Sequence, residues 1–574
     1  MTKSINKRVP GSNPALTPAF IRFGAFALIV LCLYGVISRL WACEDAYITF
    51  RYIENWLGGY GLVYNIGERV EGFTHPLWLF LIAIPTFLGL AVRASALWLS
   101  LVLTLAAVSL AAFADQDHRG RRLILPLALV IFVTNSGWRD FSVSGLEFPL
   151  VCLLLVVFYI SYKRHGLLGK RSLHGALLAL LYLTRPELVI LGLSFYLIEF
   201  VRGIGLIVKK RKGQFRYWCG DIIGLSLPIL ILAGGYHLFR WFYYGELFPN
   251  TYYAKAGLGT YWSQGWAYFE HFWRYSPVLA AAILLALVLL ISSAAWREAW
   301  RSNERRLVML AQALLLMFYV TRLGGDFMAF RFYLPSLVLF ALTINDLPNY
   351  LIRSKLVAQL GVALLLVATA LLAFLPIRAP LRVVHIADER QYYDLWHPAY
   401  RALFEEPSAH LWYEKGQILR RLQEDTNYPL VVATGNIGYL GYAAGPRVHI
   451  VDAYGLVDYD VARNWQIRTT GERGRPGHEV KLSLELAIAK HVTIWTTTFA
   501  DWNEVMDTQI GTLITIDPEF MKYFPEKVAR LKELKAYHLE HSAPNSDILF
   551  FIGLLEGEYG ISIEDLPDEA GGKI

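Results

Sequence analysis

Two adjacent acidic residues follow the first apolar run of the sequence, which spans residues 20 to 40. They are Glu44 and Asp45. If a helix begins here at the membrane interface, Asp45 and Thr49 share one face because they are four residues apart, while Arg51 points elsewhere. A carboxylate fixed in this direction can act as a general base toward a hydroxyl group, provided that a nearby cation keeps it ionised. Asp45 is also suited to capping the helix at its amino end, and Glu44 can take whichever role Asp45 does not.

Basic side chains at the outer ends of other apolar runs suit a lipid phosphate. A guanidinium group offers forked hydrogen bonds to phosphate oxygens, and a phosphodiester at the membrane surface needs such donors. The candidates for this contact are Arg51, Arg185, Arg331, Lys255 and His75. Two of them have a simpler alternative, because Arg185 can pair with Glu187 and Arg331 can pair with Asp326.

Four further residues near the same membrane face can contact a ligand rich in hydroxyl groups. Glu147 and Asp326 can orient hydroxyl groups or position cations, or they can cap the helices that follow them. Tyr252 can stack on a ring of such a ligand, although tyrosine at this boundary more often belongs to the interfacial belt. Asn250 follows a proline and can bind a hydroxyl group or form a turn.

The elements that position these residues are helices in a membrane. The chain has 574 residues, of which 55% are hydrophobic and only 18% are charged, and its mean hydropathy is +0.39. These values lie outside the range of soluble proteins, so a purely soluble enzyme is excluded. The net charge of +7 comes from short basic clusters between apolar runs, which is typical of topology determinants. We therefore expect a lipid bilayer, and no nucleic acid, as a partner.

Twelve apolar runs are candidates for transmembrane helices. The basic clusters between them belong on the cytoplasmic side, and they share that side only if one early run does not cross. The run that starts at Pro76 is short and contains Pro85, so we expect it to lie along the outer interface. The prediction is then about eleven transmembrane helices, a cytoplasmic amino terminus and interfacial helices in the first outer loop. The runs are 20–40, 76–90, 94–113, 122–137, 147–162, 172–184, 187–201, 218–240, 277–295, 307–321, 331–345 and 355–377.

The composition changes near residue 380, where charged residues become frequent and apolar runs shorten to strand length. We therefore predict a membrane domain over 1–379 and a soluble domain of mixed α/β structure over 380–574, on the outer side. Strands are expected at 429–433, 447–451, 491–497 and 547–553. Helices are expected at 411–424, 435–444, 481–490 and 525–535.

Asp452, Asp458 and His478 are the candidate acceptor-binding residues of the soluble domain. The segment that contains the two aspartates can bind the acceptor, or it can seat the soluble domain on the outer loops. His478 and Glu479 lack the second histidine of a zinc-protease helix, and the four cysteines show no metal-ligand spacing. The sequence therefore requires no cofactor and shows no metal site, although an acidic cluster can hold a divalent cation.

Several segments resemble the GT-C type membrane glycosyltransferases. The most specific are 44–52 (EDAYITFRY), 61–65 (GLVYN) and 67–74 (GERVEGFT), which together are similar to the opening of the terminal β-(1→2) arabinofuranosyltransferase family of actinobacterial cell walls. Further matching segments are 144–147, 184–187, 244–255, 324–328, 452–458 and 477–479.

This resemblance implies a transferase that moves a sugar from a polyprenyl-phosphate donor to a glycan acceptor outside the cytoplasmic membrane. In such families an acid of the first outer loop is the catalytic candidate, and it corresponds to Asp45. The chain departs from the usual pair of aspartates, because Glu44 stands beside Asp45. Arabinofuranose is one candidate sugar, and a hexose or another pentose stays open.

The chemistry of the outer side supports a lipid-linked donor independently of the resemblance. Nucleotide sugars stay in the cytoplasm, so a transferase outside needs a sugar that a lipid has already carried across. Two alternatives stay open, namely transfer to lipid A or protein, and a flippase or exporter of lipid-linked sugars without enzymatic activity. An exporter needs polar residues along a path across several spans, whereas here they gather on one membrane face. We therefore favour a transferase in the bacterial cytoplasmic membrane.

Overall fold

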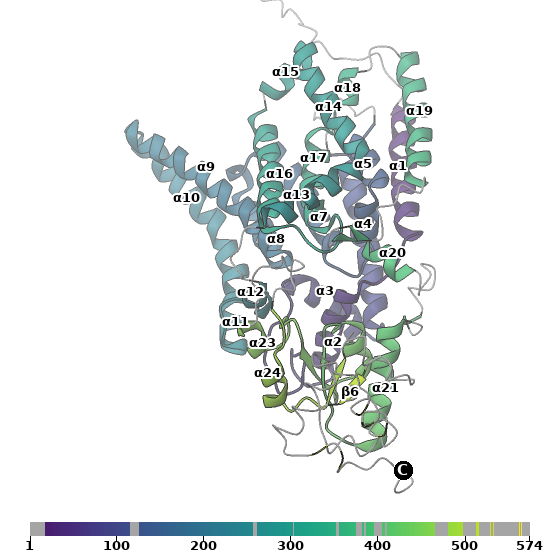
Figure 1. The fold of residues 1–574 in the computed structure, drawn as a ribbon. Coiled ribbons are helices and arrows are strands. Elements are labelled where there is room, and N and C mark those ends of the chain that lie inside the picture. Colours follow the sequence, from purple (N-terminus) through teal and green to yellow (C-terminus); the bar gives the residue numbers. More distant parts are fainter. Residues whose placement is uncertain are drawn as a thin grey trace, which may run out of the picture.

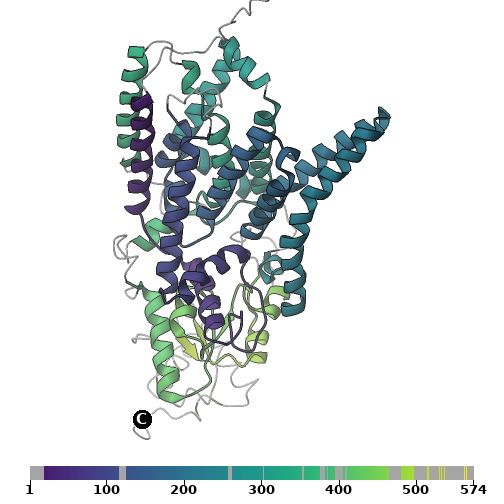
Figure 2. The ribbon, with the colours of Figure 1, turned by 180° about the vertical axis from the view of Figure 1, so that it is seen from behind.

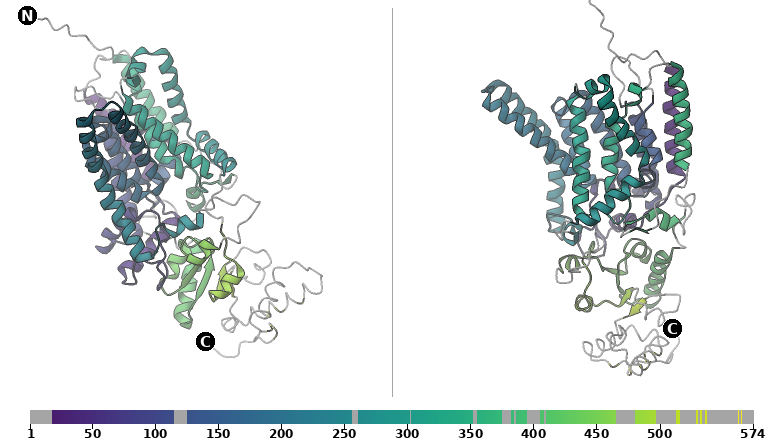
Figure 3. Two further views of the ribbon diagram at one scale, coloured as in Figure 1. Left: turned by 90° about the vertical axis from the view of Figure 1, so that its left-hand side faces the viewer. Right: turned by 45° about the horizontal axis from the view of Figure 1, so that its top comes forward.

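The computed structural model of the protein is mostly helical (Figure 1). Long helices form a body, and a smaller lobe with a β-sheet lies beyond one end of these helices (Figures 1 and 3). The structure describes residues 18–114, 125–255, 261–301, 303–351, 355–374, 382–383, 386–394, 405–407, 410–464, 480–496 and 513–515, with the single positions 529, 532, 536, 562 and 564.

Six of the described helical segments are long and apolar enough to cross a membrane. A seventh is available if α13 (Trp262–Arg274) and α14 (Pro277–Ser292), which bend by 85° at the break between them, count as one span. The chain is therefore a multi-pass membrane protein, as its composition predicts. The six spans are formed by α1 (Pro18–Ile37), α4 (Val92–Ala112), α7 (Phe148–His165), η2 (Pro186–Leu188) with α9 (Val189–Val208), α10 (Lys212–Ile229) with η3 (Leu230–Gly234) and α11 (Gly235–Tyr244), and α16 (Glu304–Leu323).

Every apolar run of the sequence contains a helix, but several of these helices are too short to cross the bilayer alone. α5 (Leu127–Thr134), α8 (Arg171–Thr184) and α17 (Leu334–Thr343) have 8, 14 and 10 residues, whereas a span needs about 20. All of α17 and nearly all of α5 are buried inside the body. Hydropathy alone does not separate such core helices from spans. The count of eleven spans therefore stays a prediction.

The two ends of the body differ in the charge of their connections. α15 (Ala294–Arg301), α18 (Pro348–Leu351) and the start of α19 (Lys355–Phe374) lie at the end opposite to the lobe (Figure 1). The α9–α10 hairpin, whose tip carries the basic cluster 209–216, also points away from the lobe (Figures 1 and 2). The basic clusters that the structure describes thus stand at the end opposite to the lobe, which is the arrangement that the predicted sidedness requires.

Short helices lie between the body and the lobe. α2 (Glu44–Leu57) begins directly after Cys43, and its two acidic residues in the first turn are favourable because a helix amino terminus is electropositive. α3 (Pro76–Phe87) starts with proline at its first position and has only 12 residues, too few to cross the bilayer. The other short elements around the body are α6 (Ser136–Phe141), η1 (Leu168–Lys170), α12 (Asn250–Lys255) and η4 (Arg331–Tyr333).

The lobe contains a four-stranded sheet with strand order β4-β3-β5-β6. β3 pairs in parallel with β4 and β5, and β5 pairs in antiparallel fashion with β6. The predicted strands at 429–433, 447–451 and 491–497 overlap β3, β4 and β5, and the predicted crossover at 435–444 contains α22, which packs against α21. The predicted elements at 525–535 and 547–553 lie outside the continuously described residues. The lobe elements are α21 (Leu411–Thr426), β3 (Val431–Thr434), α22 (Tyr439–Ala444), β4 (His449–Asp452), α23 (Tyr459–Arg463), α24 (Leu484–Ala489), β5 (Ile494–Thr496) and β6 (Leu513–Thr515).

The segment between body and lobe is bound to the body. β2 (Ile386–Ala387) pairs with β1 (Arg382–Val383), and Ala387 also exchanges backbone hydrogen bonds of 2.7 and 2.9 Å with Phe327 and Ala329. Arg390, at the start of α20 (Glu389–Asp394), donates to the backbone carbonyl at the end of the first span. The chain is therefore anchored to the loops at the lobe-facing end of the body immediately before it enters the lobe.

Candidate active site

Asp45 forms an ion pair with Arg331 from a distant part of the chain. Its Oδ2 accepts a hydrogen bond of 3.1 Å from Nη1 of Arg331, which opens η4. The helix cap position belongs to Cys43, so Asp45 stands in the first turn and does not cap α2. The Asp45 side chain is 28% exposed, more than any other acid of this cluster. The most accessible carboxylate of the site is thus held in place by a guanidinium group.

Glu147 lies behind this pair and is shared by two arginines. Its Oε1 lies 3.3 Å from Nη1 of Arg185 and 4.0 Å from Nη2 of Arg331. Burial by itself raises the pKa of Glu147, but Arg185, Arg331 and His75 outweigh burial and bring this pKa to about 2. Arg185 also pairs with Glu187, as the sequence suggests. Glu147 is therefore a buried anion that holds both guanidinium groups.

Asp326 completes the cluster from the loop before η4. Its Oδ2 lies 3.9 Å from Nη1 of Arg331, and its Oδ1 accepts a hydrogen bond of 2.9 Å from the backbone of Phe327. Burial raises the pKa of Asp326, and the charges of Arg331 and Lys255 oppose that rise. Lys255 itself ends α12 and is exposed. The structure therefore brings Asp326 to the site and leaves Lys255 at its edge.

The cluster contains buried polar atoms that the described residues leave without a hydrogen-bond partner. Such atoms are rare in folded proteins, and each costs about 1–3 kcal/mol when nothing satisfies it. Four of them in one place indicate a site that a polar or charged ligand completes. They are Glu147 Oε2, Arg185 Nη1, Asp326 Oδ2 and Arg331 Nε.

His75 connects this cluster to α2. Its Nε2 lies 2.8 Å from Oγ1 of Thr49, and its Nδ1 lies 3.7 Å from Oε2 of Glu147. Thr49 is one helical turn after Asp45, so both residues lie on one face of α2, as the sequence predicts. The structure thus brings His75 to the site as a neighbour of Glu147.

Glu44 and Arg51 lie on the other side of α2 and bind the lobe. Oε1 of Glu44 accepts backbone hydrogen bonds from Gly438 at 2.6 Å and Tyr439 at 3.2 Å. Burial and the nearby charge of Asp45 raise the pKa of Glu44, which these two hydrogen bonds oppose. Its position next to Asp45 in the sequence makes Glu44 a catalytic candidate, whereas in the structure its carboxylate binds the lobe.

The guanidinium group of Arg51 is enclosed by backbone carbonyls. It donates to the carbonyls of Tyr64 and Val448 at 2.8 Å each and to that of Gly441, and it stacks over the Tyr64 ring. Only 3% of Arg51 is exposed. The expectation that Arg51 contacts a lipid phosphate is not met in this arrangement, because the lobe covers the residue. Sequence spacing predicts the face of Arg51 but not its partner.

Asn250 and Tyr252 are two further predicted residues that stand apart from the cluster. Nδ2 of Asn250 donates to the carbonyls of Gly455 at 2.7 Å and Asp458 at 2.9 Å, and its Oδ1 accepts from Arg463 at 2.8 Å. Asn250 therefore ties the body to the lobe. Tyr252 is exposed, and its ring lies 4.6 Å from that of Phe248, as in an interfacial belt.

The two aspartates predicted to bind the acceptor use their carboxylates within the lobe. Asp452 accepts hydrogen bonds from three backbone amides of the following turn, and burial raises its pKa to about 7. Asp458 caps α23 and pairs with Lys490 at 3.2 Å. Together with the contact of Asn250, this geometry favours the alternative in which the segment seats the lobe on the outer loops. His478 lies outside the described residues.

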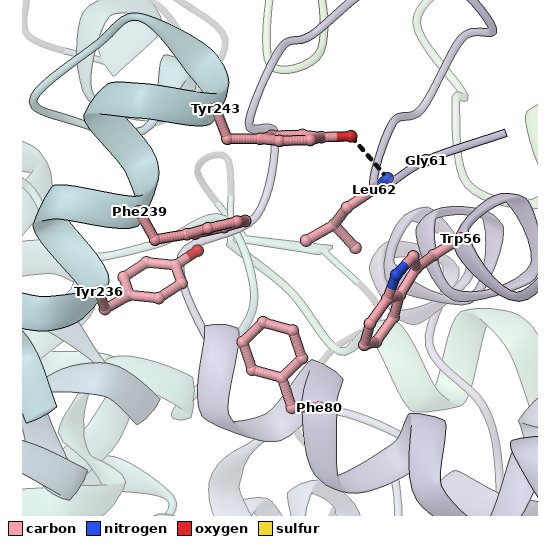
Figure 4. A pocket seen from close by; sticks show the side chains of 7 residues that line it. All are labelled: Trp56, Gly61, Leu62, Phe80, Tyr236, Phe239 and Tyr243. Carbon is pink, nitrogen blue, oxygen red and sulfur yellow. Dashed lines mark hydrogen bonds between the residues drawn. The ribbon is translucent and has the colours of Figure 1, made fainter. Parts of the chain in front are cut away.

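An aromatic cavity of about 350 Å³ lies between α11 and the segment that contains α2 and α3 (Figure 4). Tyr236, Phe239 and Tyr243 form one wall, since spacings of three and four place them on one face of α11. Trp56 and Phe80 face them across the gap (Figure 4), with their ring centres 5.6 Å apart. This cavity is not among the features predicted from the sequence, although the aromatic spacing in α11 is a signal for it. Its lining residues are Trp56, Gly61, Leu62, Phe80, Tyr236, Phe239 and Tyr243.

The cavity and the charged cluster are connected by two helices. α3 begins directly after His75 and carries Phe80, about 7 Å further along the helix axis. α8 ends directly before Arg185 and carries Tyr182, whose hydroxyl lies 2.7 Å from Nε2 of His237 on α11. The apolar cavity is therefore within a short distance of the arginines.

A second buried ion pair, between Glu71 and Arg240, also escaped the sequence analysis. Arg240 binds both carboxylate oxygens of Glu71, and the Tyr236 hydroxyl donates to the same carboxylate at 2.6 Å. Arg240 stands at the end of an apolar run, and a charge in that position is the signal that could have revealed the pair.

The chain is similar to two curated proteins. One, from Corynebacterium glutamicum, is 30% identical over 371 residues, which cover 59% of this chain and 52% of the relative. The other, from Mycobacterium tuberculosis, is 29% identical over 368 residues, which cover 57% of this chain and 56% of the relative. Both relatives are terminal β-(1→2)-arabinofuranosyltransferases. The chain thus spans about half the length of the curated relatives it matches, and no family model matches it.

One solved structure is also similar. It is the crystal structure of ArnT from Cupriavidus metallidurans bound to undecaprenyl phosphate, with a TM-score of 0.49 and 12% sequence identity. The similarity covers 79% of this chain and 89% of that chain.

Proposed function

We propose that the protein is a GT-C type glycosyltransferase that moves a sugar from a polyprenyl-phosphate donor to a cell-envelope glycan. Its similarity to two arabinofuranosyltransferases supports this class of reaction. The observation that carries the proposal is the position of Asp45, a partly exposed carboxylate bound to Arg331 above a buried cluster of acids and arginines. A base and a phosphate-binding group are thus side by side, as transfer from a phosphodiester requires.

The reaction begins with Asp45 as the general base. Asp45 takes the proton of the acceptor hydroxyl while the hydroxyl oxygen bonds to the anomeric carbon of the sugar. The bond between this carbon and the phosphate oxygen breaks, and the phosphate leaves on its lipid with one additional negative charge. Arg331 and Arg185 stabilise this charge, because guanidinium groups in a site with little water interact strongly with an oxyanion.

The aromatic cavity suits the part of the lipid chain next to the phosphate. Its walls are aromatic and aliphatic side chains, and α3 leads from His75 at the cluster to Phe80 in the cavity. The neighbouring residues Trp241 and Phe242 are exposed on α11 and contact the surrounding lipid in this arrangement. A polyprenyl chain that enters from the membrane thereby reaches the arginines with its phosphate.

The sugar and the acceptor are proposed from the relatives, and the membrane orientation is proposed from the charge distribution. Arabinofuranose is the sugar that the names of the relatives suggest, and a polysaccharide of the cell envelope is the acceptor. We further propose about eleven spans in the bacterial cytoplasmic membrane, with the amino terminus in the cytoplasm and the lobe outside; the basic clusters support this orientation. Because Glu44, Arg51 and Asn250 tie the lobe to the outer loops, the lobe forms a fixed wall beside Asp45.

The direct test is a transfer assay with the purified full chain. Radiolabelled sugars on a panel of polyprenyl phosphates, including arabinofuranose, another pentose and a hexose, are offered with a cell-envelope glycan in detergent. We expect label on the glycan from one donor and none when the glycan is omitted. The same donors are then placed in vesicles that contain the protein. If lipid-linked label changes leaflet and the glycan stays unlabelled, the protein is an exporter and the transferase proposal is wrong.

A further inference from the structure

Both ring nitrogens of His75 face side chains from different elements. Nε2 lies 2.8 Å from the Thr49 hydroxyl on α2, and Nδ1 lies 3.7 Å from Oε2 of Glu147 at the start of α7. All three residues are buried, with exposed fractions of 2% for Thr49, 8% for His75 and 3% for Glu147. A neutral imidazole in such a place adopts one defined tautomer, because water is not available as a substitute hydrogen-bond partner.

The charge of Glu147 decides which ring nitrogen carries the hydrogen. Arg185 and Arg331 keep Glu147 ionised, and an ionised carboxylate only accepts hydrogen bonds. The nitrogen that faces it, Nδ1, therefore carries the hydrogen. Nε2 is left with a lone pair, which accepts the hydrogen of the Thr49 hydroxyl. The Thr49 hydroxyl, which can donate or accept, thus stabilises the tautomer of His75 that Glu147 requires.

We propose that His75, held by Thr49 as the Nδ1–H tautomer, is a positioning residue that fixes Glu147 and through it the two arginines of the site. Oε2 of Glu147 has no hydrogen-bond partner among the described residues, while Oε1 faces Arg185 and Arg331. The Nδ1–H group is thus the donor placed to restrain the free oxygen. A movement of about 0.5–0.8 Å brings the two atoms to an ordinary hydrogen-bond distance. Catalytic contacts commonly tighten in this way when substrate binds.

This inference rests on the proposed function, because it assigns the arginines to the leaving phosphate. A partner in the outer layer of a site keeps the inner groups in the productive direction, and its loss typically costs about 10–100-fold in activity. His75 does not touch the sugar or the phosphate in this account. It acts through Glu147, so its effect falls on kcat more than on the binding of the donor.

Burial and four nearby charged groups set the pKa at which the His75 ring gains its charge. Burial is the largest influence and lowers the pKa of His75; Arg331 and Arg185 lower it further, while Glu147 and Asp45 oppose them. The ring is therefore neutral at neutral pH. As the pH falls through this lowered pKa, below the ordinary value of about 6.5, His75 becomes a cation that competes with both arginines for Glu147. Activity is lost on the acidic side.

Two amide substitutions separate the roles of the two ring nitrogens. Asparagine in His75→Asn places an N–H group near the position of Nδ1, whereas glutamine in His75→Gln places its amide near that of Nε2. We expect H75Q to lose at least about tenfold in kcat with little change in the KM of the donor, and H75N to lose several-fold less. The loss of activity at low pH that protonation of His75 causes is expected to be absent in H75N. Equal losses in H75N and H75Q, with an unchanged pH profile, overturn the proposal.

Thr49 supplies a matched pair of variants. Thr49→Val has the same shape without the hydroxyl, and Thr49→Ser keeps the hydroxyl. We expect T49V, like H75Q, to have a lower kcat with little change in the KM of the donor. T49S is expected to keep most of the wild-type kcat. If T49S and T49V behave alike, the hydroxyl does not hold His75 in the proposed tautomer and the proposal is wrong.

The tautomer itself can be measured without any transfer reaction. Nitrogen-15 NMR of the full chain labelled at histidine, compared with the spectrum of H75N, identifies the two ring signals of His75. We expect a protonated Nδ1 and an unprotonated Nε2 near pH 7.5. A protonated Nε2, or an imidazolium ring, contradicts the inference even if the protein transfers sugar. Conversely, the expected spectrum in a protein that transfers no sugar leaves the tautomer intact and refutes the proposed function.

Discussion

Two buried acid–arginine pairs of this protein are similarly exposed but differ in their hydrogen bonding. The side chains of Glu71 and Arg240 are 1% and 4% exposed, and those of Glu147 and Arg185 are 4% and 5% exposed. Every polar side-chain atom of the first pair is hydrogen-bonded or in contact with solvent, since Tyr236 and backbone groups complete it. The second pair leaves one buried atom on each partner without a hydrogen bond.

This difference separates a structural ion pair from a site. A closed pair with all its hydrogen bonds can only hold elements together, here the first outer loop and α11. An open cluster has donors and acceptors left for a ligand, at a cost in stability that the rest of the fold offsets. Burial and charge alone therefore do not identify the active site. Among the residues that the structure describes, buried atoms without a hydrogen bond also occur elsewhere, for example in the Arg306–Asp346 pair, so they indicate a site only where several acids and arginines gather beside an accessible carboxylate such as Asp45.

The largest effect on stability is expected at the closed pair. Arg240→Met removes the partner of a fully buried carboxylate, which typically costs about 3–5 kcal/mol. We expect a strong fall in the melting temperature of the purified protein in detergent, followed by fluorescence or by light scattering. If R240M melts like the wild type, the Glu71 pair contributes nothing and the comparison fails.

The same substitution at the open cluster is expected to act on catalysis. Arg185→Met removes one of two groups assigned to the leaving phosphate, and the loss of such a donor costs about 10²–10³ in kcat. Its effect on melting is expected to be smaller than that of R240M, because Glu147 keeps Arg331 and His75. Single-turnover transfer and melting curves of both variants test this contrast. A variant R185M with normal kcat and low stability reverses the assignment of the two pairs.

A smaller effect is expected at the cavity wall. Phe239→Ala removes an aromatic contact to the lipid chain, which is worth roughly 1 kcal/mol, or about fivefold in the KM of a long-chain donor. Trp241→Ala is the matched control, because Trp241 is on the same helix and exposed but does not line the cavity. A donor with a very short chain is expected to show no difference between F239A and the wild type. Equal effects of F239A and W241A on long donors exclude the cavity as the chain site.

The sequence predicts those features of the site that depend on local spacing. The helix after residue 43, the common face of Asp45 and Thr49 and the different direction of Arg51 all follow from a period of 3.6 residues. The strands β3, β4 and β5 follow from short apolar runs bounded by turn residues. These features need no knowledge of distant partners.

Other features depend on contacts between distant segments and could not be predicted in this way. Asp45 and Arg331 are 286 residues apart, and nothing in either motif says that they meet. Glu44 and Arg51 have residue types suited to catalysis, yet the lobe takes both through backbone groups that any sequence carries. Likewise, α17 has the composition of a span but is buried within the body, because neighbouring helices surround it.

The central claim is that Asp45, and not the adjacent acid, accepts the proton of the acceptor. The most direct measurement is single-turnover transfer by Asp45→Asn and Glu44→Gln, with donor binding measured on the same preparations. We predict that D45N binds donor normally and transfers about 10²–10⁴ times more slowly, while E44Q transfers at nearly the wild-type rate because glutamine still accepts the backbone hydrogen bonds of the lobe. Transfer by D45N at close to the wild-type rate, or loss in E44Q alone, contradicts the account.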